Sequence, residues 1–245
     1  MRINRYLALA GRGARRKCEE LVRQGRIEVN GETISRLSFD VDPDSDLVTC
    51  DGERLRPPRK LLYAVMNKPS GVVVTAEDER GRTTVYDLLP GRLRGKLRAV
   101  GRLDRASEGL LLFTNDGILA HALLHPSRGI ERTYMAWVRP GPDAEAMRAL
   151  RSGVQIGPRE RSGPAEVRAL GRRGGGTGRV RVTIREGKNR EIRRMFRAVG
   201  VQVLALRRIR FDGLELGELG VGSVRPLSPA ETRQLEEAAG LKRGA

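Results

Sequence analysis

The sequence is poor in residues that would mark several classes of protein. It has 2 cysteines in 245 residues, and aromatic residues make up only 4% of the chain. Two cysteines cannot form a disulfide framework, which favours a reducing compartment, and we expect a cytoplasmic protein. No run of about 18 apolar residues is present, so we expect no membrane-spanning helix. The first residues also lack the apolar stretch of a secretory signal.

Histidine is equally scarce, and this argues against a metal site. The chain has 2 histidines, His121 and His125, which lie four positions apart in a segment expected to be helical. Glu does not follow His121 and no third ligand is evident, so the pair lacks the pattern of a zinc enzyme. We expect both to be packing or surface residues and expect no metal.

Acidic residues are too few to balance the basic ones. The chain has 47 Lys and Arg against 30 Asp and Glu, which gives a net charge of +17 and a pI near 11.1. Codon bias in a GC-rich genome would explain arginine in place of lysine, but not the excess of bases over acids. A polyanionic partner is favoured, because neutralised phosphates release condensed counterions. Nucleic acid fits best, and an anionic membrane is the competing partner.

The excess of positive charge is sharpest at the start of the chain. Residues 1–26 carry eight Arg or Lys and two Glu, whereas residues 27–53 carry eight acids and one Arg. Apolar spacing predicts helices over 3–10 and 14–25, with Cys18 on a buried helix face. Strands are expected at 26–30 and 48–51, each followed by a tight turn at Asn-Gly or Asp-Gly.

These elements resemble the S4 RNA-binding domain, expected over residues 1–58. The resemblance rests on "RRKCEELVRQGRIEVNG" and "DLVTCDGERL". Ala14 stands where many members have a capping Ser, so the second helix is less well capped. The alternative is a basic helix face that is merely solvated. The resemblance implies RNA contacts by Arg2, Arg5, Arg15, Arg16, Lys17 and Arg23.

Residues 54–60 contain Pro57 and Pro58 and are predicted to be a linker to a second domain over 59–245. In that domain strands and helices alternate. Strands are predicted at 61–66, 72–75, 97–103, 110–114, 132–138, 165–170 and 179–185. Helices are predicted at 84–89, 118–124, 143–150, 189–199 and 229–239, the last opened by a capping box at Ser228 and Glu231. The glycine-rich stretch 171–178 lacks the Lys-Ser/Thr of a nucleotide loop and is expected to be a hairpin tip.

The helix over 189–199 has two distinct faces. One stripe is apolar and the other is basic, offset by about 200° around the axis. We expect the apolar stripe in a core and the basic stripe against a negative partner. The apolar stripe is Ile192, Met195, Phe196 and Val199, and the basic stripe is Arg190, Arg193, Arg194 and Arg197.

Asp104 is the candidate reactive residue. It follows an expected buried strand and is flanked by Arg102 and Arg105. Two neighbouring guanidinium groups favour the ionised carboxylate, and a positioned carboxylate can act as a nucleophile. From local chemistry alone, a structural Asp in a turn is the favoured interpretation, because structural ion pairs are common.

The segment "GRLDRASEGLLLFTNDG" (101–117) resembles the signature of pseudouridine synthases, in the small-ribosomal-subunit type that carries an N-terminal S4 domain. "MNKPSGVV" (66–73), "RTYMAWV" (132–138), "EGKNREIRRMF" (186–196) and "LRRIRFDGLELGELGVGSVRPLS" (206–228) follow in the family's order. The likeness is closer to members that modify large-subunit (23S) rRNA, with a 16S rRNA enzyme as the alternative. The resemblance implies an α+β fold, in which the catalytic domain has a mixed, mainly antiparallel sheet flanked by helices.

The resemblance also implies roles for single residues. Asp104 matches the reacting aspartate, Tyr134 the ring that stacks on the base, and Lys188 the cation paired with the aspartate. Arg102 matches the residue that fills the place of the flipped base, and Ile192 an aliphatic contact to it. Arg105, Arg190 and Arg193 are further candidate substrate contacts. The reaction needs no cofactor, and a monomer acting on ribosomal RNA is expected.

Two other functions fit parts of the sequence. A non-catalytic S4-type factor in ribosome assembly would keep the basic helices without needing Asp104. A glycosidase-type enzyme would use a second carboxylate, such as Glu108, and release free base. A methyltransferase is disfavoured, since no strand, glycine-rich turn and helix form a cofactor site.

Overall fold

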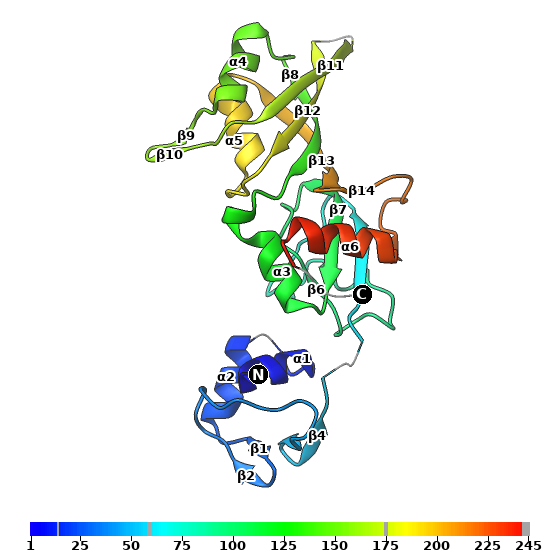
Figure 1. Ribbon diagram of the computed structural model, residues 1–245. Helices are drawn as coiled ribbons and strands as arrows, with labels where there is room; N and C mark the ends of the chain where they lie inside the picture. The colour runs from blue at the N-terminus through cyan, green and yellow to red at the C-terminus, as the bar shows by residue number, and fades with distance from the viewer. Residues whose placement is uncertain (14, 58–59, 174–175, 242–245) are drawn as a thin grey trace. The chain divides into compact units, whose positions relative to one another are not determined.

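The computed structural model describes residues 1–13, 15–57, 60–173 and 176–241 (Figure 1). The chain divides into two compact units, Met1–Leu61 and Leu62–Ala245. The division falls three residues beyond the predicted limit at 58, and Pro58 of the expected linker lies outside the described residues. No helix in the described ranges is long and apolar enough to cross a membrane.

The first unit packs two helices against a small antiparallel sheet of order β2-β1-β3-β4. Its elements are α1 (Ile3–Leu9), α2 (Arg15–Arg23), β1 (Ile27–Val29), β2 (Glu32–Thr33), β3 (Val48–Cys50) and β4 (Glu53–Leu55). Cys18 is fully buried on the apolar side of α2, as predicted. Asn30 and Asp51 adopt φ angles of 53° and 51°, which permits the two predicted tight turns. Ala14, the expected weak cap, lies outside the described residues.

The second unit is built on one nine-stranded sheet. The main path runs β11-β12-β8-β13-β7-β5-β15, with β14 on β13 and β6 on β7. Among the strands that the structure describes, only β13 and β7 pair in parallel, so the predicted mixed and mainly antiparallel sheet is confirmed. The strands are β5 (Tyr63–Lys68), β6 (Arg98–Ala99), β7 (Ser107–Thr114), β8 (Arg132–Arg139), β11 (Glu166–Arg173), β12 (Thr177–Ile184), β13 (Gln202–Phe211), β14 (Leu214–Glu215) and β15 (Val224–Pro226). A separate hairpin joins β9 (Gln155–Gly157) and β10 (Glu160–Arg161).

Helices cover the sheet in two groups (Figure 1). The helices α4 (Ala144–Ser152) and α5 (Glu191–Ala198) pack into the core cluster that contains Val138 and Val182. The helices α3 (Gly117–Leu124) and α6 (Pro229–Ala238) share a second cluster with Leu110 and Leu112. A short 3-10 helix, η1 (Pro126–Arg128), follows α3. The predicted capping box at Ser228 and Glu231 opens α6.

Three predicted elements of the second unit are wrong. Residues 72–75 form only one bridge, between Val73 and Thr84, and the segment predicted to be a helix at 84–89 instead forms turns over residues 85–88. The carboxylate of Asp87 accepts hydrogen bonds from the backbone and hydroxyl of Thr84, so local side-chain bonds replace helical ones. The strand predicted at 97–103 shrinks to β6, because Gly101 adopts a φ of 76°. Apolar side chains in these loops still fill the core.

The sequence pattern also missed the central strand β13. Its arginines at 207, 208 and 210 hide the alternation that marks a half-buried strand. Arg208 is only 2% exposed, and its Nε donates to the carbonyl of Leu110 at 2.7 Å. This internal bond lets a basic residue occupy a buried position, which propensity alone does not predict.

Candidate active site

Asp104 is half-buried and lies in the loop between β6 and β7, whose backbone is held by neighbouring residues. The carbonyl of Asp104 accepts a hydrogen bond from the backbone N–H of Ser107 at 3.0 Å. The ammonium group of Lys68, fully buried at the end of β5, donates to the carbonyls of Pro69, Arg105 and Ser107 at 3.0, 3.3 and 2.7 Å. These bonds fix the backbone on the C-terminal side of Asp104.

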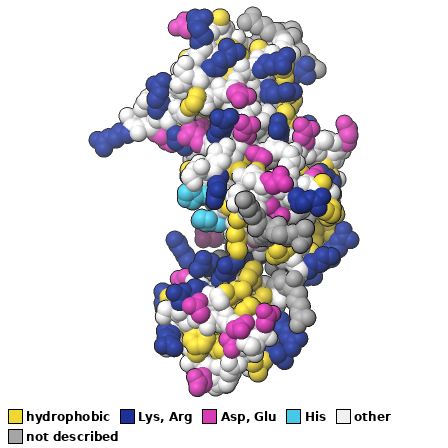
Figure 2. All heavy atoms as spheres, viewed as in Figure 1, with side chains coloured by type: hydrophobic (Ala, Val, Ile, Leu, Met, Phe, Trp, Pro, Cys, Tyr) yellow, Lys and Arg dark blue, Asp and Glu magenta, His cyan; other side chains and the backbone are white. Residues whose placement is uncertain are grey.

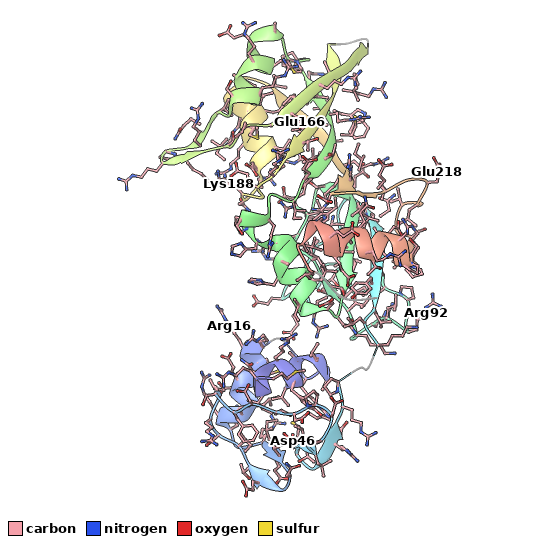
Figure 3. The ribbon with its side chains drawn as sticks, in the orientation of Figure 1. Arg16, Asp46, Arg92, Glu166, Lys188 and Glu218 are labelled. Carbon is pink, nitrogen blue, oxygen red and sulfur yellow. The ribbon has the colours of Figure 1, made fainter. Side chains whose placement is uncertain are left out.

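The loop opens into a cavity of about 480 Å³ between the sheet, α3 and the start of α5. Seven of the eight residues predicted for catalysis or substrate contact line it: Arg102, Asp104, Tyr134, Lys188, Arg190, Ile192 and Arg193. Figure 3 shows Lys188 beside the N-terminal end of α5. The eighth residue, Arg105, does not line the cavity, because its Nε donates to the carbonyl of Gly71 at 3.0 Å.

Two apolar surfaces form the walls nearest the sheet and α5. Tyr134 projects from β8 and is 8% exposed, and Ile192 projects from the first turn of α5 and is 3% exposed. Both belong to the core cluster while also lining the cavity. A planar base placed here would contact an aromatic ring and an aliphatic side chain.

The cations that act on Asp104 are Lys68 and Arg193. Burial lowers the pKa of Lys68 to about 8, and the charges of Asp104 and Glu108 oppose that shift. Burial also lowers the pKa of Arg193, where Arg190 adds to the shift and Asp104 opposes it. In the part of the chain that the structure describes, Asp104 forms no ion pair within 4.0 Å.

Lys188 does not pair with Asp104 as predicted. Its Nζ lies 2.8 Å from Oε2 of Glu186 and donates to the carbonyl of Arg161 at 2.6 Å. The sequence pattern could not distinguish Lys188 from Arg193, because both are basic residues of the same motif. The turn before α5 directs Lys188 to Glu186, whereas Arg193 projects one turn later.

A pair of carboxyl groups supports this turn. Glu191 is 4% exposed, and burial followed by the neighbouring Glu186 raises its pKa to about 8. Burial opposes ionisation of Glu186 as well, but hydrogen bonds from Glu191, Lys188 and the backbone of Gly163 outweigh it and lower its pKa to about 2. The raised pKa of Glu191 favours its protonated form, and the lowered pKa of Glu186 keeps it ionised as the partner of Lys188.

The four arginines of the basic stripe of α5 differ in their contacts: two are bonded within the chain and two are exposed. Arg193 donates to the carbonyls of Val203 and Ala106 at 3.0 and 3.3 Å, and Arg194 pairs with Glu160 at 2.7 Å. Arg190 and Arg197 are exposed. The predicted negative partner of Arg194 is therefore a carboxylate of the chain itself, whereas Arg193 is bonded to backbone carbonyls.

Several lining residues were not foreseen from the sequence. Arg132 and Arg208 are 9% and 2% exposed, and their guanidinium carbons each lie 5.3 Å from the ring centroid of Phe211. Nη2 of Arg208 is buried without a hydrogen-bond partner. The motif "RTYMAWV" contains Arg132 and the tail motif contains Arg208, so both could have been considered as cavity residues.

The basic residues of the first unit are mostly accessible. Arg15, Arg16, Lys17 and Arg23 are exposed along α2, whereas Arg5 is half-buried in α1. Arg2 pairs with Asp40 at 3.0 Å, which reduces the charge it offers to a ligand.

Comparison with known proteins matches both units of the chain to known families. Residues 62–198 match the family model described as RNA pseudouridylate synthase, and residues 1–48 match the S4 domain. The chain belongs to the RNA pseudouridylate synthase family. It is therefore an enzyme of the pseudouridine synthase class that carries an S4 domain, and both the predicted family and the predicted fold are confirmed.

Relatives in this family match almost the whole chain. An uncharacterized RNA pseudouridine synthase of Mycobacterium tuberculosis is 41% identical over 98% of this chain and 95% of its own length. The ribosomal large subunit pseudouridine synthase B of Bacillus subtilis is 37% identical over 97% of this chain and 96% of its own length. A crystal structure of a pseudouridylate synthase superposes with a TM-score of 0.70 at 29% identity, covering 96% of this chain and 99% of that one.

Proposed function

We propose that this enzyme converts a uridine of 23S ribosomal RNA to pseudouridine, with Asp104 as the reacting carboxylate. The single observation that carries the proposal is the cavity in which Asp104, Tyr134, Ile192 and Arg193 meet. Relatives named ribosomal large subunit pseudouridine synthase B, at 37% and 42% identity, support the large-subunit target. In this proposal the enzyme is a cytoplasmic monomer acting on a structured rRNA segment or a precursor particle.

The reaction begins with removal of the target base from its stack, since its reacting atoms are inaccessible inside a helix. The exposed side chain of Arg102 at the mouth of the cavity is suited to fill the vacated place. The everted base would then lie between the ring of Tyr134 and the side chain of Ile192. Both side chains are buried in the core, so the base would leave water and pack against two side chains that are held in place.

The chemistry is an isomerisation whose atoms balance without a co-reactant. The bond from N1 to C1′ breaks, the uracil turns, and a bond from C5 to C1′ forms. The proton that leaves C5 is matched by one gained at N1. Asp104 supplies the negative charge next to the sugar and base, and Arg193 and Lys68 stabilise that charge. We therefore assign the charge-partner role to Arg193 in place of Lys188, which is bonded to Glu186.

The geometry disfavours the two-carboxylate glycosidase. Glu108 lies on β7 and pairs with Arg207 at 3.2 Å, and it is not among the residues that line the cavity. A general acid must lie within reach of the reacting bond. Glu108 therefore lacks the position required of a second catalytic carboxylate.

The test is an Asp104→Asn variant assayed on transcribed 23S and 16S rRNA. We expect pseudouridine in 23S rRNA with the wild type and a loss of at least ~1000-fold in rate with Asp104→Asn, while RNA affinity is kept. Glu108→Gln is the matched carboxylate control and should stay active. Unimpaired modification by Asp104→Asn would refute the enzyme mechanism, release of free uracil would indicate a glycosidase, and product in 16S rRNA alone would move the target.

A further inference from the structure

One face of the catalytic sheet carries arginines that lack acidic partners. On β8, Tyr134 and Ala136 point into the core, so Met135 and Trp137 point to the opposite face. The antiparallel register places Arg179 opposite Trp137 and Arg181 opposite Met135, and it pairs Arg168 with Arg181. We call these five residues the arginine–tryptophan face.

The positive charges on this face destabilise the sheet. Arg168 and Arg181 are direct cross-strand neighbours, and like charges in that position destabilise a sheet. Arg168, Arg179 and Arg181 are all exposed, and the described residues provide no ion pair for any of them. Of the carboxylates nearby, Glu108 pairs with Arg207, and the exposed Glu166, two positions from Arg168 on β11, forms no ion pair with these arginines among the described residues.

The same face carries apolar surface of the kind found at interfaces. Trp137 is the only tryptophan of the chain and is partly exposed, and Met135 beside it is also partly exposed. The guanidinium of Arg207 lies 5.8 Å from the ring centroid of Trp137. Leu204, at a bulge of β13 next to Ala205, is 45% exposed, and Ala205 is the other cross-strand partner of Trp137. Trp, Met and Arg are the residue types enriched at interfaces.

We propose that the arginine–tryptophan face is a second RNA-docking surface, which binds a segment of the substrate RNA distant from the target uridine. Arginine side chains would neutralise phosphates, and Trp137 would offer a stacking platform. Figure 2 shows Lys and Arg side chains gathered over β11 and β12, the strands that carry the three arginines. The proposal rests on the proposed function only in taking RNA as the substrate.

This surface differs from the cavity in direction and in chemistry. The cavity opens on the side to which Tyr134 points, and the arginine–tryptophan face lies on the side to which Met135 and Trp137 point. One nucleotide cannot occupy both. An RNA that reaches both sides must be large, so short stem-loop substrates should not sense the face.

The single tryptophan provides a direct test in the full-length chain. Titration with a transcribed 23S rRNA fragment should quench the emission of Trp137, because a base or phosphate would approach the ring. The triple variant Arg168→Gln, Arg179→Gln and Arg181→Gln should lose the quenching at RNA concentrations that saturate the wild type. An emission that RNA leaves unchanged in the wild type would overturn the proposal.

Salt dependence separates docking from a general loss of charge. The control triple variant Arg92→Gln, Arg148→Gln and Arg233→Gln removes the same charge from exposed positions on three other segments. Loss of three phosphate contacts should lower the slope of log K against log salt by about 2 to 3 in the face variant. It should also raise KM for long RNA with kcat unchanged. Equal effects of the two triple variants would overturn the proposal.

The outcomes also distinguish this inference from the proposed function. If the wild type forms no pseudouridine but shows the quenching and the slope change, the docking surface stands and the proposed function fails. If activity is normal and KM for long RNA is the same in the wild type and the face variant, the docking surface fails alone. Binding of phosphatidylserine vesicles that requires the three arginines, with unchanged RNA affinity, would replace RNA by a membrane and overturn the proposal.

Discussion

At the scale of single residues, the buried ammonium group of Lys68 bonds to the loop that carries Asp104. Its ammonium group donates to the carbonyls of Pro69, Arg105 and Ser107, of which only the bond to Ser107 is fully buried, and the carbonyl of Arg105 also accepts from the backbone N–H of Gly71. We expect Lys68→Met to lower the free energy of unfolding by about 1–3 kcal/mol, because the buried carbonyl of Ser107 would lose the donor that compensates its desolvation. The rate should fall as well, since the loop that carries Asp104 loses its support.

Urea unfolding and single-turnover kinetics would check this prediction. Lys96→Met is the control, because Lys96 is an exposed lysine. If Lys68→Met matched the control in both stability and rate, the ammonium group would have no role in holding the loop.

Glu191 gives a prediction that depends on pH. Its pKa rises from the ordinary 4.5 to about 8 in the folded chain. Between these values the folded state keeps a proton that the unfolded state releases, so this group's contribution to stability is lost as pH rises through the window. Glu191→Gln, which mimics the protonated form, should therefore gain in Tm relative to the wild type between about pH 5 and pH 8. Thermal unfolding across that range would measure it.

Glu231 serves as the opposite control. Its hydrogen bonds with Arg225 lower its pKa to about 2, so its contribution is present at neutral pH and is lost as pH falls toward 2. Glu231→Gln should therefore be less stable than the wild type at neutral pH and approach it in acid. Parallel stability curves for Glu191→Gln and the wild type would contradict the assignment of Glu191 as a protonated acid.

The residue scale also shows what the sequence could predict about the site. Asp104, Tyr134 and Ile192 were predicted from motifs, and all three line one cavity. The partner of Asp104 could not be found in this way, because Lys188 and Arg193 belong to the same motif and only the start of α5 separates their directions. Glu191 was missed because its raised pKa results from burial, which a single sequence does not reveal.

At the scale of elements, Gly109 allows two strands to meet in parallel. It adopts a φ of 102° on β7, and a Cβ atom there would lie 2.2 Å from the carbonyl oxygen of Arg208 on β13. Gly109→Ala combines an unfavourable backbone angle with a backbone clash, so we expect a loss of more than about 3 kcal/mol. Chemical unfolding would measure the loss.

Gly117→Ala is the matched control, because nothing lies within 4 Å of a Cβ built there and that position opens α3. A cost for Gly109→Ala below about 1 kcal/mol would mean that β7 and β13 can separate without penalty.

Elements differed in how well the sequence predicted them. Helices with a strong apolar stripe, such as α5, and strands with plain alternation, such as β12, were predicted within a few residues. The strands and the helix predicted within residues 72–103 were mostly wrong, because the apolar side chains of this segment reach the core from loops that are held by local hydrogen bonds. The strand β13 was missed because buried Arg208 depends on a carbonyl acceptor from a strand almost a hundred residues away.

At the scale of the whole molecule, we expect the S4 unit, Met1–Leu61, to contribute to RNA affinity. The exposed residues Arg15, Arg16 and Lys17 lie together at the start of α2. Changing all three to Gln should reduce the slope of log K against log salt by about 2 to 3 and weaken binding, with kcat at saturating RNA retained. Filter binding over a range of salt concentrations would measure the slope.

An unchanged slope would show that these side chains do not contact phosphate. A fall in kcat at saturation would instead indicate that the S4 unit takes part in forming the active state of the catalytic unit.

The helix α5 presents Ile192 and Arg193 to the cavity and anchors Met195 and Phe196 in the core less than two turns later. The same helix therefore contributes both to recognition of the base and to the stability of the protein core. A substitution that relaxes the fit to uracil will in general also loosen the interior, so new base preferences should evolve in this enzyme only after compensating gains in stability elsewhere.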